Sequence, residues 1–458
     1  MTKVLLIGYN PPQIVPKVKI EAAHYRTWQF LQPLLDDGHE VCLCAGTRDE
    51  VASGDDVPPA WRDHLVYNPV AFGAGDWAQQ MQAAHDAFQP QCVVAVNFSH
   101  CLYATKLKTE APIWMEIYGD ALTIMQAGAF RAQSDRGIET QIAFMREVLR
   151  KGDVFSGCGR AQCHMMVGEL AMAGRLNSRT FGYEFTRAIL PGSPPKVGEG
   201  LLSVAARGIP AEGPDGVPAR QLLVQHGILD TDFVVLWCGG YNTWTDVETL
   251  FQGLEAAMQS DPHLHYVSVG ANTYSAPDNV YDRFVNMAAA SPHRDRYHML
   301  GWRPWSEMAT YYRESNVGIN IDALHYETIF GTRTRLVEMI ASGLPVVTSL
   351  GAELSYLLRD AGIALTFEVG DWQTLGQNLA QMAANAELTQ KMAVAAYRYA
   401  QEDLSFSATT APLRQWVLEP APAPDKAALS QSEKVRQVEH RARTALRQVI
   451  WRVSGADR

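Results

Sequence analysis

The sequence lacks the features that would place it among metal-binding, disulfide-rich or membrane-spanning proteins. None of its 7 cysteines forms a CxxC pair, and no histidine cluster accompanies them at zinc spacing. Most of them lie in or beside apolar runs such as VCLCAG and QCVVAV, so we predict free buried thiols in a reducing compartment. No uncharged apolar run reaches about 18 residues, so no transmembrane helix is expected.

The sequence also has no excess of basic over acidic residues. The net charge is -10 at pH 7, which argues against a general nucleic-acid binder. The 458 residues are 47% hydrophobic and 19% charged, so we expect two or three domains with large cores. The first residues, MTKVLLIGYN, predict a short strand with no signal peptide, so we expect a cytoplasmic location.

Residues 1–189 alternate between short apolar runs and an amphipathic pattern. The segment 21–35 has helical periodicity, with Tyr25 and Phe30 among its expected core positions. Short apolar strands separated by helices predict a parallel sheet that is covered on both faces. The strands expected in this domain are 4–8, 40–45, 93–97 and 113–117.

Residues 190–218 are rich in Pro and Gly and are predicted to be a linker. The alternation of apolar strands and amphipathic helices resumes in 219–400, which we expect to be a second Rossmann-like domain. A helix over 401–419 is expected to return toward the first domain. The strands expected here start at Phe233 and span 265–270, 297–300, 317–321 and 345–349. The expected helices are 246–257, 305–315, 333–342 and about 371–401.

The tail, 420–458, combines a Pro/Ala linker with a basic amphipathic helix predicted over 432–453. Such a helix can lie on an anionic membrane surface. A solvated or partner-packed helix fits equally well, and the sequence leaves both open. The basic residues of this helix are Lys434, Arg436, Arg441, Arg443, Arg447 and Arg452.

The segment HYETIFGTRTRLVEMIASGLPVVTS, 325–349, carries the most specific pattern. It predicts a loop, then a helix starting near 332–335, then a buried strand. A helix N-terminus in a doubly wound sheet is an anion site, where Arg333 and Arg335 would add positive charge for a diphosphate. Glu338 could accept hydrogen bonds from ribose hydroxyls, and Glu327 could reach sugar hydroxyls. Alternatively, Arg333, Arg335 and Glu338 only brace their helix.

This segment resembles the donor site of retaining glycosyltransferases of the GT-B fold, family 4 (group 1). Glu338 with Gly-Leu-Pro-Val-Val at 343–347 fits the second half of the family signature. The first half departs from it, because Phe330 occupies the position of the first glutamate. Glu327-Thr328, Phe330 and Arg333-Thr334-Arg335 instead look like a branch with Glu-Thr-x-Phe followed by Arg-Thr-Arg. Residues implied for donor binding also include Gly331 and Thr332.

The segment WCGGYNTWTDVETL, 237–250, resembles the Gly-Gly loop of the same branch. It implies donor contacts from Gly239, Gly240 and Asn242. The Arg and Lys of the family's diphosphate clamp are missing from this loop, and Arg303 with the 333/335 pair would compensate. The whole resemblance covers about residues 1–416 and implies two Rossmann-like domains that face each other across a cleft.

Acceptor ligands are expected on the first domain, at the carboxyl ends of its strands. Asn10, His100 and Glu116 follow or end such strands. The resemblance implies a His or an acid beside the sugar ring, and we assign this role first to Asp120. Asp120 could instead cap the next helix. Arg26, with Lys17 or Lys19, could meet an acceptor phosphate or simply be solvated.

We therefore expect an α/β protein of the GT-B fold that moves a sugar from a nucleotide-diphosphate sugar to an acceptor hydroxyl, with retention and without metal or cofactor. Asp230-Thr231-Asp232 matches the Asp-x-Asp pattern of metal-dependent transferases, but it directly precedes a buried strand, where acids commonly end a turn. The basic tail favours a lipid-linked or cell-surface glycan acceptor and a peripheral position at the inner face of a membrane. The alternatives are a sugar-nucleotide epimerase and a non-catalytic nucleotide-sugar-binding protein.

Overall fold

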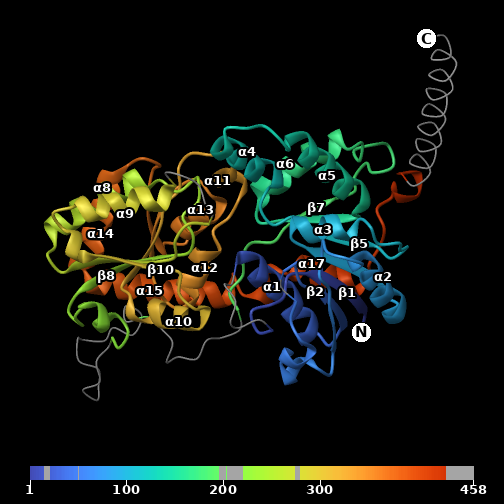
Figure 1. The fold of residues 1–458 in the computed structure, drawn as a ribbon, viewed down its shortest axis with the longest axis horizontal. Helices are drawn as coiled ribbons and strands as arrows, with labels where there is room; N and C mark the ends of the chain where they lie inside the picture. The colour runs from blue at the N-terminus through green and yellow to red at the C-terminus, as the bar shows by residue number, and fades with distance from the viewer. Residues whose placement is uncertain (15–20, 50, 195–202, 204–219, 274–278, 430–458) are drawn as a thin grey trace, which may run out of the picture.

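The computed structural model describes residues 1–14, 21–49, 51–194, 203, 220–273 and 279–429. They form two α/β domains that lie side by side along the long axis of the molecule (Figure 1). The N-terminal domain has a 7-stranded sheet of order β3-β2-β1-β4-β5-β6-β7, and the C-terminal domain has a 6-stranded sheet of order β10-β9-β8-β11-β12-β13. All paired strands in both sheets are parallel. The predicted doubly wound α/β architecture is therefore confirmed.

The N-terminal sheet is buried on both faces because its central strands are apolar at successive positions. On β1, Leu5 and Ile7 pack into one core, and Val4 and Leu6 pack into the core on the opposite face. The strands are β1 (Lys3–Gly8), β2 (Glu40–Ala45), β3 (Leu65–Pro69), β4 (Cys92–Val96), β5 (Ile113–Glu116), β6 (Val154–Gly157) and β7 (Thr186–Ala188). The main helices are α1 (Ala22–Asp36), α2 (Trp77–Phe88), α3 (Phe98–Ala104), α4 (Ala121–Ala132), α5 (Ile138–Lys151) and α6 (Arg160–Met172).

The C-terminal sheet repeats this arrangement. Val234 and Leu236 of β8 face one core, and Val235 and Trp237 face the other. The strands are β8 (Phe233–Cys238), β9 (Leu264–Val269), β10 (Tyr297–Gly301), β11 (Val317–Asn320), β12 (Val346–Ser349) and β13 (Ala364–Phe367). The helices are α8 (Val247–Ser260), α9 (Val280–Ala290), α10 (Trp305–Glu314), α11 (Tyr326–Phe330), α12 (Thr334–Ala341), α13 (Glu353–Asp360), α14 (Trp372–Ala384) and α15 (Ala386–Glu402).

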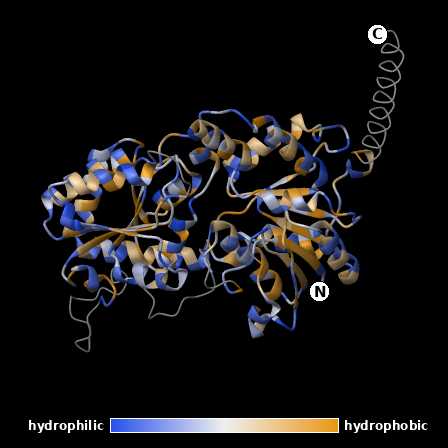
Figure 2. Cartoon of the chain, in the orientation of Figure 1, coloured by the Kyte–Doolittle hydropathy of each residue, from blue (hydrophilic) through white to orange (hydrophobic). Residues whose placement is uncertain are grey.

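Figure 2 shows hydrophobic residues concentrated on the strands inside each domain. All seven cysteines are buried and free, as predicted. Across the described ranges, the search for a helix long and apolar enough to cross a membrane found none. The helix expected over about 371–401 is two helices, α14 and α15, because Asn385 interrupts it and caps the second one.

The chain returns to the N-terminal domain after α15. Helices α16 (Phe406–Thr409) and α17 (Ala411–Leu418) follow, and Leu413 and Val417 of α17 enter the core on one face of the N-terminal sheet. Ser193 and Ser405 form a parallel β-bridge, which joins the two segments that connect the domains. The Phe406 amide donates to the Ser193 carbonyl at 2.9 Å, so these segments are hydrogen-bonded to each other.

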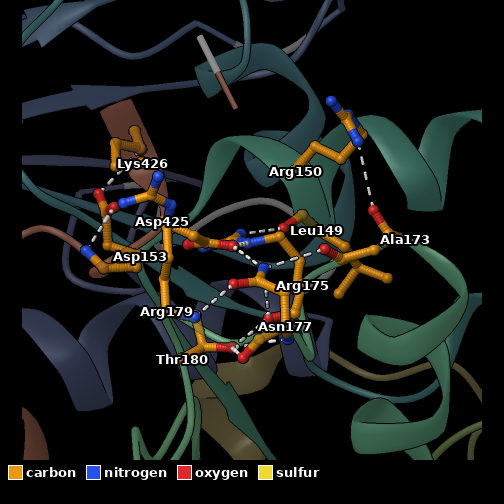
Figure 3. A network of polar contacts seen from close by, with 12 residues as sticks. Leu149, Arg150, Asp153, Ala173, Arg175, Asn177, Arg179, Thr180, Asp425 and Lys426 are labelled. Carbon is orange, nitrogen blue, oxygen red and sulfur yellow. Dashed lines mark hydrogen bonds and ion pairs between the residues drawn. The ribbon is translucent and has the colours of Figure 1, made fainter. Parts of the chain in front are cut away.

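The segment after α17 is anchored by ion pairs, which Figure 3 shows in close-up. The Arg175 guanidinium donates to both carboxylate oxygens of Asp425, at 2.9 and 3.0 Å. The Lys426 ammonium lies 2.9 Å from Asp153. The described chain therefore ends on the N-terminal domain. The predicted basic helix over 432–453 and nearly all of the linker over 190–218 lie outside the described residues.

Candidate active site

A cleft of about 910 Å³ lies between the two domains at the carboxyl ends of their strands. In both sheets the strand order reverses beside the first strand, next to β4 in one domain and β11 in the other. Such reversal points open a crevice in which ligands bind. Tyr9 and Asn97, which follow β1 and β4, line this cleft from one side, and Gly239, which follows β8, lines it from the other.

Arg333 is the N-cap of α12 and is buried by an ion-pair network. Its Nε donates to Asp322 at 2.8 Å, and Nη1 and Nη2 donate to the two oxygens of Glu327 at 3.1 and 2.8 Å. Further hydrogen bonds reach the Thr332 carbonyl and the Thr328 hydroxyl. Burial lowers the pKa of Arg333, but the two carboxylates outweigh it and raise the pKa above its ordinary value. A guanidinium has five N–H donors, so this one has none left for a diphosphate.

Arg335 has no such carboxylate partner. Its guanidinium carbon lies 4.1 Å from the centroid of the Trp237 ring, and Nη2 donates to the Gly240 carbonyl at 3.2 Å. Nη1 is buried and has no hydrogen-bond partner among the described residues. Burial lowers the pKa of Arg335. Of the two predicted anion-binding arginines, Arg335 is therefore the one whose charge is available to a ligand.

Glu338 lies about one turn further along α12 and also lines the cleft. The Tyr312 hydroxyl donates to its Oε2 at 2.7 Å. Burial raises the pKa of Glu338, while the bond from Tyr312 and the charge of Arg335 oppose that rise. A carboxylate held at one oxygen in a cleft can accept hydrogen bonds from a ligand's hydroxyl groups.

Glu327 lines the cleft as well, but both of its oxygens accept from Arg333. Gly331 packs so closely on Glu327 that a Cβ there would collide with its carbonyl and carboxylate. This close approach, rather than a ligand contact, explains the glycine, and Gly331 does not line the cleft. Thr332 does line the cleft, and its hydroxyl is buried with no partner in the described structure.

Four further predicted donor-side residues line the cleft: Gly239, Gly240, Asn242 and Arg303. Gly239 has φ of 105°, a left-handed backbone conformation that favours glycine. The Asn242 side chain accepts from the Thr273 hydroxyl at 2.7 Å, which fixes the loop after β8. Arg303 follows β10, beside Trp302, which is 41% exposed. An aromatic side chain there offers a flat apolar surface to a ligand.

The predicted acceptor-side residues do not line the cleft. Arg26 and Glu116 form a buried ion pair at 2.7 Å, and Arg26 also donates to the carbonyls of Ile189 and Leu190. With 1% of its surface exposed, Arg26 is placed to brace α1 against the sheet rather than to meet an acceptor phosphate. Lys17 and Lys19, which were considered together with Arg26, lie outside the described residues.

Asp120, His100 and Asn10 are likewise buried. Asp120 caps α4, accepting from the Thr123 amide at 2.5 Å, which is the alternative role that the sequence allowed. His100 Nε2 lies 3.0 Å from the Gly46 carbonyl, and burial lowers the pKa of His100 to about 4. Asn10 accepts from the Tyr67 hydroxyl at 2.8 Å. In this structure these side chains support the loops behind the cleft.

Two tyrosines that the sequence did not single out line the cleft from the N-terminal domain. Tyr118, between Glu116 and Asp120, forms a hydrogen bond with the Thr334 hydroxyl in the first turn of α12. Tyr25, on α1, was expected only in the core. Tyr118 could have been found from the sequence, because it lies in a segment at the end of a predicted strand. Tyr25 could not, because the helical periodicity of its segment marks it as a core residue.

The two domains contact each other around the cleft. Besides the Tyr118–Thr334 bond, Arg131 donates to the Thr243 hydroxyl at 2.8 Å, and the Ala161 amide donates to Glu353 at 3.1 Å. These hydrogen bonds join the two domains around the cleft.

The Asp-x-Asp pattern at 230–232 lies before β8, at the end of the sheet away from the cleft. Asp230 accepts from the Arg220 amide, and Asp232 accepts from the Leu229 amide. Neither residue lines the cleft, which agrees with the turn assignment. In the described part of the chain, no group of three or more His, Cys, Asp or Glu side chains could hold a metal ion.

The sequence of residues 232–385 matches the family described as glycosyl transferases group 1. This stretch covers β8 to α14, including the loop after β8 and all of α12. No curated protein matches the sequence significantly.

Solved structures share the fold over nearly the whole chain. Sucrose-phosphate synthase from Thermosynechococcus elongatus superposes with a TM-score of 0.61 at 16% identity, covering 91% of this chain and 98% of that one. Anabaena HepE, solved in complex with UDP-glucose, gives 0.62 at 13% identity, covering 91% and 99%. WaaG, a glycosyltransferase involved in lipopolysaccharide biosynthesis, gives 0.57 at 14% identity, covering 91% and 100%. These structures establish the GT-B fold, and with a group 1 glycosyl transferase sequence over residues 232–385 the protein is a glycosyltransferase.

Proposed function

We propose that this enzyme transfers a sugar from a nucleotide-diphosphate sugar to an acceptor hydroxyl, with retention of configuration and without a metal ion. The observation that carries this proposal is that Arg335 and Glu338, one turn apart on α12, both line the cleft. Arg335 offers positive charge at the helix N-terminus, where a diphosphate is favoured. Glu338, one turn away, accepts from ribose hydroxyls.

The first donor to test is a UDP-sugar, because Anabaena HepE was solved with UDP-glucose and with UDP. The base would lie against Trp302 and Arg303, beyond the ribose and away from the N-terminal domain. Metal independence follows from the proposed charge balance, since Arg335 and the N-terminus of α12 supply the positive charge that a metal would otherwise provide.

Retention is supported by the carboxylates that line the cleft. These are Glu21, Glu327 and Glu338. Glu327 is locked in a two-point ion pair with Arg333, and Glu338 is held by Tyr312 beside the donor nucleotide. We propose that none of the three attacks the sugar, and that the acceptor hydroxyl approaches on the face that the diphosphate leaves.

The acceptor proposed is a lipid-linked or cell-surface glycan, used by a cytoplasmic enzyme at the inner face of a membrane. The support is the charge of the C-terminal sequence, in which basic residues outnumber acidic ones over 432–453. The described chain ends on the N-terminal domain, to which we assign the acceptor side of the cleft.

A screen of the full-length protein against nucleotide sugars tests the proposal, with thermal shift to detect binding and mass spectrometry to detect products. We expect one UDP-, GDP- or ADP-sugar to stabilise the protein and to be hydrolysed slowly to nucleotide and free sugar in the presence of EDTA. Conversion to an isomeric nucleotide sugar would identify an epimerase instead. Binding with no turnover under any acceptor would favour a non-catalytic protein, and no binding at all would refute the donor site.

A further inference from the structure

Tyr25 combines burial with an unpaired polar atom. The residue is 4% exposed, yet its hydroxyl has no hydrogen-bond partner among the described residues. Buried tyrosine hydroxyls normally find a partner, so an unpaired one requires an explanation. Tyr25 is among the residues that line the cleft, so this unpaired hydroxyl belongs to a residue in the wall of the space that a ligand would fill.

The ring of Tyr25 is held in place by two aromatic neighbours. Its centroid lies 5.6 Å from that of Trp28 and 5.6 Å from that of Phe406, with edge-to-face geometry in both cases. Trp28 and Phe406 pack on each other at 5.1 Å. Phe406 belongs to the segment that returns from the C-terminal domain. The hydroxyl is thus fixed by packing on both sides, as a preorganised ligand contact requires.

The electrostatic surroundings of Tyr25 include a carboxylate of α12. Burial raises the pKa of Tyr25 well above its ordinary value, and the charge of Glu338 adds to this. Tyr118, which also lines the cleft, is hydrogen-bonded to Thr334 in the first turn of the same helix. A tyrosine hydroxyl is protonated at neutral pH, so that of Tyr25 is available as a donor.

Two other cleft-lining groups are unpaired in the same way, and both come from the opposite domain. They are Thr332 Oγ1 and Arg335 Nη1. With Tyr25 Oη, they make three buried polar atoms that border one cleft and can each donate a hydrogen bond. None of the three has a hydrogen-bond partner among the described residues. A ligand rich in anionic oxygens would satisfy all three.

We propose that the Tyr25 hydroxyl donates a hydrogen bond to the diphosphate of the donor, completing from the N-terminal domain the site that Arg335 and Thr332 form on the other. This inference rests on the proposed function. When the anomeric C–O bond breaks, its electron pair stays on the diphosphate, and the acceptor oxygen forms the new bond. The acceptor proton passes to the diphosphate. Because the diphosphate gains charge in this step, the bond from Tyr25 strengthens in the transition state.

Calorimetry on the full chain tests this contact with Tyr25→Phe, which keeps the ring and its packing. The ligands are the nucleoside diphosphate that stabilises the wild type most and the matching monophosphate. We expect diphosphate affinity to fall on the order of tenfold or more, while monophosphate affinity changes little. Tyr183→Phe is the matched control, because its hydroxyl donates to the Asp153 carbonyl on the N-terminal domain, outside the cleft lining.

The inference is overturned if Tyr25→Phe binds the diphosphate like the wild type, or if it weakens both nucleotides equally. A fall in the melting temperature of Tyr25→Phe larger than that of Tyr183→Phe would also overturn it, because the hydroxyl would then have a structural partner. Failure of the wild type to bind any nucleoside diphosphate would instead refute the proposed function, which separates the two results.

Discussion

The guanidinium carbon of Arg335 lies 4.1 Å from the centroid of the Trp237 ring, at the carboxyl end of β8. Stacking on the ring fixes the plane of the guanidinium, and the bond to the Gly240 carbonyl fixes its rotation. Packing therefore fixes the direction of the unpaired Nη1. Arg335 on α12 and Arg333 at its N-cap are therefore only two residues apart but have different surroundings.

Arg335→Ala is expected to weaken binding of the nucleoside diphosphate by about 10- to 100-fold, the effect of losing a hydrogen bond to a charged group. Arg335→Lys should recover only part of the loss, because an ammonium cannot both stack on Trp237 and reach the ligand from a fixed plane. Isothermal titration calorimetry measures both. Arg359→Ala is the control, since Arg359 pairs with Asp360 on α13 outside the cleft lining. Equal affinities in wild type and Arg335→Ala would contradict the assignment.

Arg333→Ala should act on stability. It would leave Asp322 and Glu327 buried without their cation, at a cost of about 3–5 kcal/mol in the free energy of unfolding. Urea denaturation followed by circular dichroism checks this. A triple variant, Arg333→Met with Asp322→Asn and Glu327→Gln, should recover part of the loss because no unpaired charge remains. A stable Arg333→Ala protein that fails only in diphosphate binding would reverse the roles given to the two arginines.

Glu169 on α6 gives a pH-dependent prediction. Both of its carboxylate oxygens are buried without a partner among the described residues, and burial, with a contribution from Asp120, raises the pKa of Glu169 to about 8. The unfolded chain ionises this group near pH 4.5, so the folded state is penalised progressively as pH rises from there to about 8. Glu169→Gln should therefore stabilise the protein by about 1–3 kcal/mol at pH 8–9 and hardly at all below pH 4.5.

Chemical denaturation of wild type and Glu169→Gln across this pH range provides the measurement. Glu139→Gln, on the exposed side of α5, is the control and should show no such trend. A stability difference that is constant with pH would show that Glu169 is not held in its neutral form.

Asp425→Ala should release the segment after α17 from the N-terminal domain. The side chains of Arg175 and Asp425 are 0% and 2% exposed, so removing one leaves the other charge buried and unpaired. We expect this segment to detach locally, because local opening costs less free energy than unfolding the domain. Hydrogen exchange should accelerate over 419–429, and Lys426→Ala should have a smaller effect because Lys426 is 30% exposed. Unchanged protection in Asp425→Ala would mean that apolar packing alone holds this segment.

The sequence predicted most of the central strands and one edge strand, β10, and missed the other three edge strands. Runs such as VLLIG and VCLCA are apolar at successive positions because they are buried on both faces, and β1 and β2 follow them closely. The strands that were missed are β3, β6, β7 and β13, of which β3, β7 and β13 lie at sheet edges. Edge strands are short and partly exposed, as the pattern of Thr186–Ala188 shows, so they lack a continuous apolar signal.

The segment that the sequence singled out, 325–349, contributes residues to the lining of the cleft, but the sequence could not divide the roles within it. Arg333 and Arg335 are chemically identical in the pattern, and only folding brings Asp322, at the end of β11, onto Arg333. Likewise, Arg26 and Glu116 are 90 positions apart, and their pairing depends on how α1 crosses the sheet. Such neutralisation between distant residues has no local signature, so the sequence could not decide between a buried brace and a ligand contact.

The bridge between Ser193 and Ser405 has a mechanical consequence. The two covalent connections between the domains are hydrogen-bonded to each other there, so any rotation of one domain against the other is restrained at one place. Such a rotation would change the distance between Arg131 on α4 and Thr243 in the loop after β8, which are hydrogen-bonded in this structure. A pair of fluorescent labels at these two positions would measure it.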